Sequence, residues 1–340
     1  MLTRSDRASD PDPGRYLDRA DFASTRERIA GLVRPTPLIR SDAISKIVGC
    51  EVWLKLETLQ ITGSFKLRGA ANRMLQLSDR ERARGVIAVS SGNHGRAVAY
   101  VARRLGIQAT ICISDLVPEN KREAMRAYGA DLRVIGRSQD EAQAYADEQI
   151  AEHGLTWIAP YDDLAVIAGQ GTIASEVLEA LPQTDAILAP LSGGGLLSGL
   201  ALVGKSLSPA IEIVGASMEI EPGMVRSLEA GRPVTVEEPP SLADSIGGSI
   251  GLSNRYTFPI VRDFMDQALL VSEQSLGPAM RLLFEEEGLV MEGGSASALA
   301  AALLPGFKSD RRRTVVIVIS GRNIATPRFM SAIATRGAEG

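Results

Sequence analysis

Residues 56–74 read LETLQITGSFKLRGAANRM, and they place Lys66 directly behind a Thr-Gly-Ser-Phe turn and at the start of a helical pattern. For an isolated lysine, a solvated position in the first turn of an amphipathic helix is the ordinary interpretation. A surface lysine does not require such a turn in front of it. Whether Lys66 carries chemistry therefore depends on what the rest of the chain offers.

Short β-branched segments alternate with longer segments of helical spacing along most of the chain. The expected strands are residues 86–90, 109–114, 132–136, 185–191, 211–217, 267–272 and 314–320. The expected helices include residues 96–105, 120–128, 140–152, 171–181 and 274–287. This alternation predicts an α/β fold with parallel sheets covered by helices on both faces. Ligands bind such sheets at the carboxyl ends of the strands, so the strand-to-helix junctions are the candidate binding sites.

The composition excludes several classes of function. The 340 residues are 45% hydrophobic and 23% charged, which allows two lobes with substantial cores. A net charge of −4 and 4% aromatic residues argue against nucleic acid as a partner. The longest apolar run, residues 315–319, is too short to span a membrane, and no signal peptide is evident, so a cytoplasmic protein is expected. The two cysteines and two histidines are too dispersed to suggest a metal cluster.

Two charged segments have simple expected roles. Residues 1–20 mix charges with proline and glycine without an apolar period, which predicts a tail or a strap across the surface. The three arginines at 311–313 are expected to form a solvated approach to the last strand.

The first glycine-bearing junction is VSSGNHGRAVAY, residues 89–100. A strand ends, Ser90 to Asn93 form a turn, and a helix starts near His94, which leaves backbone N–H groups pointing outward. These groups could bind an anion. Alternatively, Ser91 or Asn93 could simply cap the helix.

The second junction is LAPLSGGGLLSGLALVG, residues 188–204. Ser192 and three glycines precede a helix that starts at Leu196, an arrangement suited to a phosphate. The loop lacks the Lys-[Ser/Thr] ending of a P-loop, and Ser198 stands where G-x-G-x-x-G needs its third glycine. Glu219 keeps a dinucleotide-binding interpretation open.

The third junction is VIVISGRNI, residues 316–324, where a hydrophobic strand ends at Ser320. Its hydroxyl could meet the ring of a ligand or cap the last helix. A lysine, a phosphate loop, an anion-binding turn and a strand-end hydroxyl are together the parts that would hold pyridoxal 5′-phosphate, an aldehyde that bears a phosphate and a pyridine ring.

These motifs resemble those of the fold-type II pyridoxal-phosphate enzymes, in the threonine dehydratase and serine racemase branch. TGSFKLRGA, SSGNHG, SGGGLLSG and the late SG-R-N follow that family's order over about residues 25–335. Within the branch the chain looks most similar to the dehydratases of hydroxyectoine utilisation. The resemblance implies the two-lobed fold of the tryptophan synthase β-subunit, with a tail at 1–20, a large cofactor-binding domain at 21–84 and 163–340, a small domain at 85–162, and a homodimer.

The resemblance also assigns roles to residues. Lys66 would carry the cofactor covalently and act as catalytic base, with Ser91 as the second acid/base of the racemases. Phe65 would lie against the cofactor, Asn93 would bind its 3-oxygen and Ser320 would face its ring nitrogen. The phosphate would be held by Ser192, Gly193, Gly194, Gly195 and Leu196. The substrate carboxylate would be bound by Ser90, Ser91, Gly92, Asn93 and His94.

Three departures from the family pattern bear on the substrate and on metal binding. Arg322 replaces the usual glycine and Arg96 a common glutamine, which suggests a larger or more acidic substrate, with Arg322 in contact with it. Ser217 replaces the glutamate that metal-dependent relatives carry after VG-x, so no metal site is expected, although the nearby Glu219 could compensate for that change.

The expected activity is that of a lyase, the loss of water from a β-hydroxy amino acid in hydroxyectoine catabolism. Two alternatives use the same site: a catabolic threonine or serine dehydratase, and a racemase for serine or aspartate. A nucleotide-binding module without catalysis is the alternative of another class.

Overall fold

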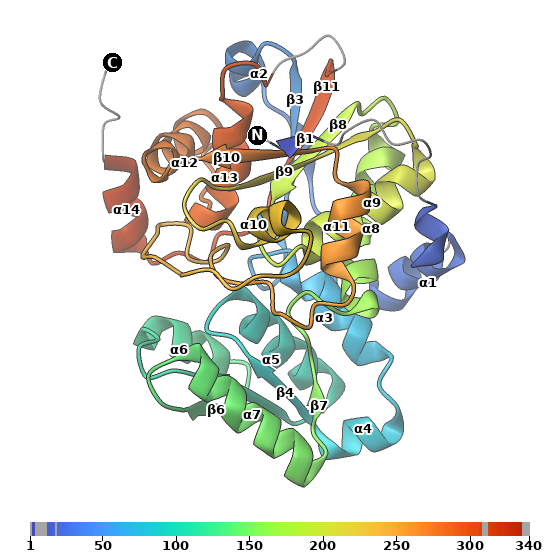
Figure 1. The fold of residues 1–340 in the computed structure, drawn as a ribbon, viewed down its shortest axis with the longest axis vertical. Helices are drawn as coiled ribbons and strands as arrows, with labels where there is room; N and C mark the ends of the chain where they lie inside the picture. The colour runs from blue at the N-terminus through green and yellow to red at the C-terminus, as the bar shows by residue number, and fades with distance from the viewer. Residues whose placement is uncertain (1, 4–11, 18, 308–311, 335–340) are drawn as a thin grey trace.

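The computed structural model describes residues 2–3, 12–17, 19–307 and 312–334, and these residues form two sheets enclosed by helices (Figure 1). The larger sheet has the strand order β1-β10-β9-β8-β11-β3-β2. Its five inner strands are parallel, and β1 and β2 pair antiparallel at the two edges. The strands are β1 (Leu2–Thr3), β2 (Leu38–Arg40), β3 (Glu51–Leu56), β8 (Ala186–Pro190), β9 (Glu212–Met218), β10 (Gln267–Val271) and β11 (Thr314–Ile319).

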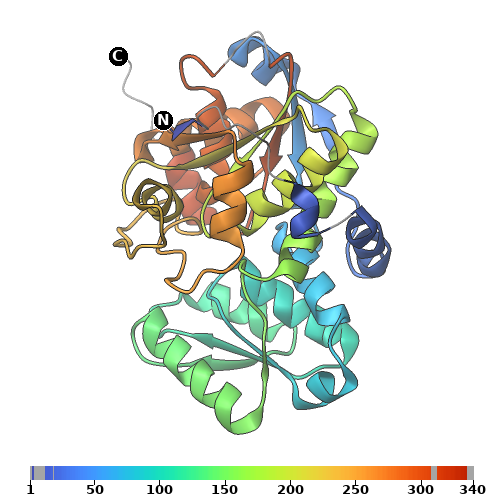
Figure 2. The same ribbon diagram turned by 45° about the vertical axis from the view of Figure 1, so that its right-hand side comes forward.

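Helices cover both faces of the larger sheet, because its inner strands are apolar on both sides. One face packs against α2 (Asp42–Val48), α12 (Glu273–Glu287), α13 (Gly293–Ala302) and α14 (Thr326–Ala334). The other packs against α8 (Leu164–Ala180), α9 (Gly195–Leu207) and α11 (Thr257–Phe264). Two further helices, α1 (Arg19–Ile29) and α10 (Gly223–Ala230), lie outside these layers (Figure 2).

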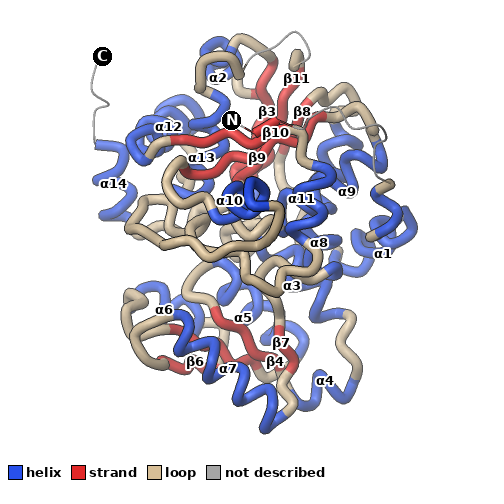
Figure 3. The backbone as a smooth tube through the Cα atoms, viewed as in Figure 1, coloured by secondary structure: helices blue, strands red, loops and turns tan. Residues whose placement is uncertain are grey.

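The smaller sheet has the order β6-β5-β4-β7 and is parallel throughout. Its elements are β4 (Val86–Val89), α5 (Asn93–Leu105), β5 (Ala109–Ile113), α6 (Glu119–Arg126), β6 (Asp131–Val134), α7 (Gln139–His153) and β7 (Thr156–Trp157). Helix α3 (Lys66–Leu75) packs on both α5 and α8, and it therefore joins the two halves of the molecule; α4 (Asp79–Arg84) follows it. Figure 3 shows the strands of both sheets inside their shells of helices.

The predicted α/β fold with parallel, helix-covered sheets is confirmed, and each of the seven expected strands is present within one or two residues. The division into residues 21–84 with 163–340 and 85–162 stays a prediction. The strands of the smaller sheet run from Val86 to Trp157. Of the expected tail, residues 1, 4–11 and 18 lie outside the described residues, whereas Leu2–Thr3 pairs with β10.

One expectation about the arginine run is wrong. Arg312 is 8% exposed and donates hydrogen bonds to Glu212, Gln267 and the Phe307 carbonyl. It is buried because Glu212 and Gln267 on the neighbouring strands β9 and β10 offer acceptors that a sequence pattern does not reveal. Within residues 2–3, 12–17, 19–307 and 312–334, no helix has the length and apolar character needed to cross a bilayer.

Candidate active site

The Thr62–Phe65 turn and the end of β11 form one local unit. Ser64 and Gly321 make an antiparallel bridge, and the Phe65 N–H donates to the Ser320 carbonyl at 3.1 Å. Gly63 has φ +78°, and a Cβ there would lie 2.6 Å from Asn323 Oδ1. The turn therefore requires glycine both for its backbone conformation and for space. It joins the first motif of the sequence to the last.

Lys66 is the first residue of α3, and it is half-buried. Its Nζ donates to the Pro160 carbonyl at 2.6 Å and lies 5.3 Å from the centre of the Phe65 ring. Removal from water lowers the pKa of Lys66 to about 8, although the charge of Glu292 acts in the opposite direction. A substantial part of this amine is consequently neutral near neutral pH, unlike that of an ordinary lysine.

The turn after β4 leaves the start of α5 without a side-chain cap. The N-cap is Gly92, and no side chain accepts from the first N–H groups of the helix. The Asn93 amide faces elsewhere and donates to Glu292 Oε1 at 2.6 Å. Of the two alternatives for this junction, a helix cap and an anion-binding turn, the cap is absent, because neither Ser91 nor Asn93 accepts from the helix. The positive end of α5 is therefore available to an anion.

His94, the next residue of α5, is buried with its ring Nε2 2.8 Å from the Ile158 carbonyl, to which it donates. Burial, followed by the nearby Lys66 charge, lowers the pKa of His94 to about 3. The imidazole is therefore neutral, and it holds the helix start against β7 instead of carrying charge.

Tyr161 and Met224 pack closely against the glycine loop that follows β8. A Cβ at Gly193 would lie 2.5 Å from the Tyr161 ring, and one at Gly194 would lie 2.7 Å from Met224 Cε. Gly194 is the N-cap of α9 with φ +85°, again without a side-chain hydrogen bond. Tyr161 follows Pro160, so the segment that holds Lys66 Nζ also supports this loop. Ser192 at the loop entrance is half-buried, whereas Leu196 in the first turn is buried.

Glu292 links the start of α5 to the loop after β11 and was not anticipated from the sequence. Its carboxylate accepts from Asn93 Nδ2 at 2.6 Å and from the Asn323 N–H at 3.0 Å, and its own N–H donates to the Gly321 carbonyl. Burial raises the pKa of Glu292 above its usual value, and the Asn93 hydrogen bond opposes that shift. The signal available in the sequence was a single acid in the otherwise uncharged stretch 289–303.

Asn323 completes this network. Its Nδ2 donates to Asn93 Oδ1 at 2.6 Å and to the Thr62 carbonyl at 2.9 Å, while its Oδ1 accepts from Arg96 at 2.9 Å. The start of α5, the Thr62–Phe65 turn and the loop after β11 are thus fixed relative to one another. Arg96 is held by Asn323, whereas Arg322 is exposed and its side chain has no described partner.

Ser320 is 5% exposed at the end of β11, and its N–H donates to Ser295 Oγ at 2.8 Å. It does not cap the last helix, since α14 begins only at Thr326. The contacts therefore join Phe65 to Lys66 and to Ser320, and they join Asn93 to the loop after β11 through Glu292 and Asn323. No group of three or more metal-ligating side chains lies together in the described part of the chain.

Comparisons with known proteins agree with this geometry. A family described as "Pyridoxal-phosphate dependent enzyme" matches residues 29–321. A relative from Sinorhizobium fredii, provisionally named a threonine dehydratase, is 48% identical over 308 residues, covering 91% of this chain and 92% of the relative. The L-threonine ammonia-lyase of Thermotoga maritima is 39% identical over 305 residues, 89% of this chain and 75% of that enzyme.

Among solved structures, maize serine racemase matches with a TM-score of 0.88 at 32% identity, covering 94% of this chain and 97% of that one. Both the sequence relatives and the structure thus point to the branch that the motifs resemble. The chain belongs to the family of pyridoxal-phosphate dependent enzymes, and it is a lyase of the threonine dehydratase-like type.

Proposed function

We propose that this enzyme removes water from a β-hydroxy amino acid with Lys66 as the catalytic base, and that its physiological substrate is a ring-opened derivative of hydroxyectoine. The observation that carries the reaction type is the amine of Lys66, whose pKa of about 8 leaves it partly neutral. This amine donates to the carbonyl of Pro160, the residue before Tyr161, which packs against the glycine loop. A neutral amine can both bond to an aldehyde and accept a proton.

The residues present fit pyridoxal phosphate. The uncapped start of α9 offers N–H donors. A side chain at Gly193, Gly194 or Gly195 would collide with neighbouring residues, so the loop presents only its backbone. Phosphate would be held there by residues 192–196. Asn93 uses one amide hydrogen on Glu292 and would direct the other to the 3-oxygen. Ser320 would face the ring nitrogen, and Phe65 the ring. When bound, the cofactor supplies the electron sink that weakens the substrate Cα–H bond.

The protein groups then have distinct tasks. Backbone donors of residues 90–94 would hold the substrate carboxylate at the positive end of α5, which needs no arginine. Lys66 would take the Cα proton, and the hydroxyl on Cβ would leave with a proton as water. His94, with a pKa of about 3, does not compete for that proton. The unsaturated amine that is released hydrolyses to a 2-oxo acid and ammonia.

The substrate proposal follows from the requirement that the leaving hydroxyl be bonded to Cβ, the carbon next to the one that bears the amine and the carboxylate. Hydroxyectoine has its hydroxyl on the carbon next to the one that bears the carboxylate, so ring opening that frees the α-amine gives a β-hydroxy amino acid with an acylated amino tail. In the closed ring that nitrogen belongs to an amidine, which does not readily condense with an aldehyde. Arg322, an exposed residue directly after Gly321, would meet polar groups on such a tail.

Ammonia release and 2-oxo acid formation from the opened derivative, intact hydroxyectoine, threonine and serine test this proposal under identical conditions. We expect the highest kcat/KM for the opened derivative, because its tail adds binding energy that smaller substrates lack. Arg322→Gly should reduce that preference. The highest kcat/KM for threonine would instead identify a catabolic threonine dehydratase, the activity that the names of the relatives favour.

A racemase is the second candidate because Ser91 and maize serine racemase support it. The half-buried Ser91 lies in the turn before α5 and caps no helix, so its hydroxyl is available to a substrate. Accumulation of D-serine from L-serine with little ammonia would establish this activity, and Ser91→Ala should abolish it while retaining dehydration. We also infer a cytoplasmic homodimer from the family resemblance, which sedimentation of the purified enzyme would check.

A further inference from the structure

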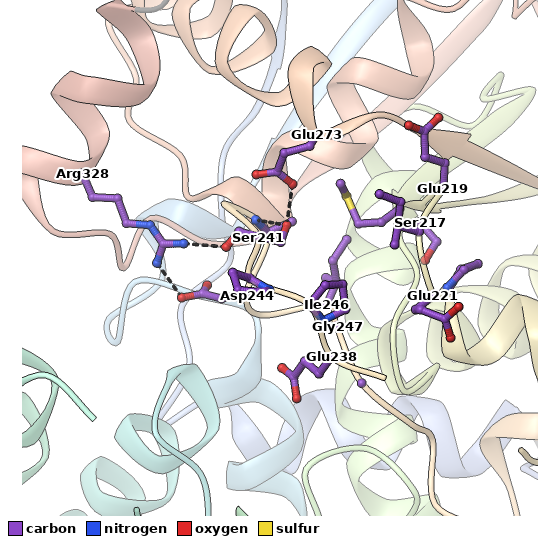
Figure 4. Close-up of a pocket in the computed structure, with 17 residues that line it drawn as sticks. Ser217, Glu219, Glu221, Glu238, Ser241, Asp244, Ile246, Gly247, Glu273 and Arg328 are labelled. Atoms are coloured by element: carbon purple, nitrogen blue, oxygen red, sulfur yellow. Dashed lines mark hydrogen bonds and ion pairs between the residues drawn. The ribbon is translucent and has the colours of Figure 1, made fainter. Parts of the chain in front are cut away.

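A pocket of about 460 Å³ lies apart from the catalytic residues (Figure 4). Its walls are the end of β9, the turn that leads into α10, the loop of residues 238–248 and the start of α12, with Arg328 of α14 at one side. None of the residues placed around Lys66, and none of the glycine loop, lines it. It is therefore a separate space on the larger half of the molecule.

Carboxylates dominate the polar lining of this pocket. Two of them are already engaged: Glu273 accepts from Ser241 Oγ and the Leu242 N–H, both at 2.6 Å, and Asp244 accepts from Arg328 at 2.7 Å. The other three are Glu219, Glu221 and Glu238. Their carboxylates have no hydrogen bond or ion pair with any part of the chain that the structure describes.

Ser217 provides an independent sign of a ligand. This residue is only 3% exposed, yet its hydroxyl has no described hydrogen-bond partner and lies at the pocket wall, on the same side as Glu219 and Glu221 (Figure 4). The hydroxyl oxygen is not fully enclosed by protein, so a ligand in the pocket can reach it and form a hydrogen bond with it. Glu221 adds to this picture, since it has φ +48°, a conformation that non-glycine residues rarely adopt.

The shape of the site decides between two classes of cation. A single metal ion needs several oxygen ligands at 2.3–2.6 Å, and no set of three metal-ligating side chains converges here or elsewhere within the described ranges. The free carboxylates instead lie on different sides of a pocket that could enclose a small organic molecule (Figure 4). Met218, Pro222, Ala243 and Ile246 give it an apolar lining.

We propose that this pocket binds a short aliphatic diamine. One ammonium group lies towards Ser217, Glu219 and Glu221, the other towards Glu238, and the hydrocarbon chain covers the apolar lining between them. Such a ligand offers a charge to the carboxylates on each side and also buries its methylene groups, whereas a metal ion has no methylene groups and a monoamine has only one charge.

The pocket is connected to the cofactor loop through α10. Helix α10 begins directly after the pocket residue Pro222, and its Met224 packs against Gly194. On the other side, Leu242 packs against Gly293 in the first turn of α13, beside Glu292. A diamine in the pocket should therefore stabilise the loop that holds the cofactor phosphate, as an effector does.

Calorimetric titration of the holoenzyme with 1,4-diaminobutane tests the proposal, with 1-aminobutane as the control ligand. We expect one site per chain, at least tenfold tighter for the diamine. Glu221→Gln and Glu238→Gln should each weaken binding about threefold to fivefold, the range for a partly exposed ion pair. Glu237→Gln is the matched control, because Glu237 is an exposed neighbour that does not line the pocket.

Three results would overturn the proposal. The first is no saturable binding of the diamine, and the second is an equal effect of the Glu237 and Glu238 substitutions, which would indicate only general screening. The third is stoichiometric binding of Mg²⁺ or Ca²⁺ that Glu221→Gln abolishes, because the pocket would then be a metal site. Slower loss of cofactor during dialysis with the diamine would support the connection through α10, and an unchanged rate would refute that connection.

Discussion

At the scale of single residues, the chemistry depends on how the protein sets the charge of Lys66. A lysine with an ordinary pKa near 10.5 is only about 0.03% neutral at pH 7, whereas one with a pKa of about 8 is about 10% neutral. Since only the neutral amine attacks an aldehyde, cofactor capture by the cofactor-free enzyme should accelerate with rising pH, with a midpoint near pH 8, and level off above about pH 9. Stopped-flow absorbance after mixing with pyridoxal phosphate at a series of pH values measures this profile. A midpoint above 10 would mean that the amine is solvated.

Glu292 should influence that profile, because its charge opposes the effect of burial on Lys66. Glu292→Gln removes the charge and retains one acceptor for Asn93, so the midpoint of cofactor capture should move to lower pH. Loss of a contact to Asn93 or Asn323 should also reduce kcat by about tenfold, as expected for a charged hydrogen bond in a positioning network. Glu286→Gln, an exposed substitution, is the control. An unchanged pH midpoint would limit Glu292 to a structural role.

At the scale of elements, the glycine loop before α9 can be tested by comparing two glycines of similar backbone conformation. Gly194 and Gly231 have φ +85° and +69°, but a Cβ at Gly194 would meet Met224 at 2.7 Å, whereas Gly231 has open space around it. Gly231→Ala should cost about 1 kcal/mol of stability from backbone strain alone. Gly194→Ala should also weaken phosphate binding at least tenfold, measured as cofactor affinity. Equal cofactor affinity in the two variants would contradict the assignment of the phosphate site.

The elements that sequence reasoning found are those with a strong local signal. The β-branched strands such as Thr314–Ile319 are apolar along their whole length, because helices cover both faces of the sheet. By contrast, β3 reads EVWLKL and carries Lys55, which is buried only because Glu176 of α8 neutralises it at 2.6 Å. Nothing near Lys55 in the sequence announces that partner, and β3 was missed for this reason.

The same distinction holds for the site. Lys66, the SSGNHG turn and the glycine loop are contiguous motifs, and sequence could assign them to one ligand. Glu292 acts on Asn93, which is 199 positions away in the chain, and such a pair becomes visible only in the fold. The capping alternative for α5 could not be decided from the sequence either, since the orientation of Asn93 depends on that distant carboxylate.

At the scale of the whole molecule, a buried ion cluster ties the two chain segments of the larger half to α3. Arg68 makes paired hydrogen bonds to Glu57 (2.8 and 2.8 Å) and to Glu176 (2.6 and 2.9 Å). Burial alone would lower the pKa of Arg68, but these two carboxylates raise it above its usual value. The guanidinium is therefore charged at any pH at which the protein is folded.

Arg68→Met should consequently destabilise the protein by about 3–5 kcal/mol, because it leaves two buried carboxylates without their main partner. Arg73→Met on the same helix should cost under about 1 kcal/mol, since the Arg73 contacts to Glu81 (3.8 Å) and Asp163 (3.3 Å) are long and partly exposed. Denaturant unfolding of both variants measures the difference. Similar losses in the two would show that the cluster adds no stability beyond an ordinary ion pair.

The strand order of the larger sheet also has a consequence for biosynthesis. β11, the last of the described strands to be made, lies between β8 and β3. Until residue 314 has been made, that sheet exists at most as two pieces with open edges, which are prone to pair with other chains. The smaller sheet, complete by Trp157, has all its strands much earlier. Ser320 and Asn323 are made still later, so the proposed site for pyridoxal phosphate is incomplete until then, and vitamin B6 loading must follow the synthesis of these two residues.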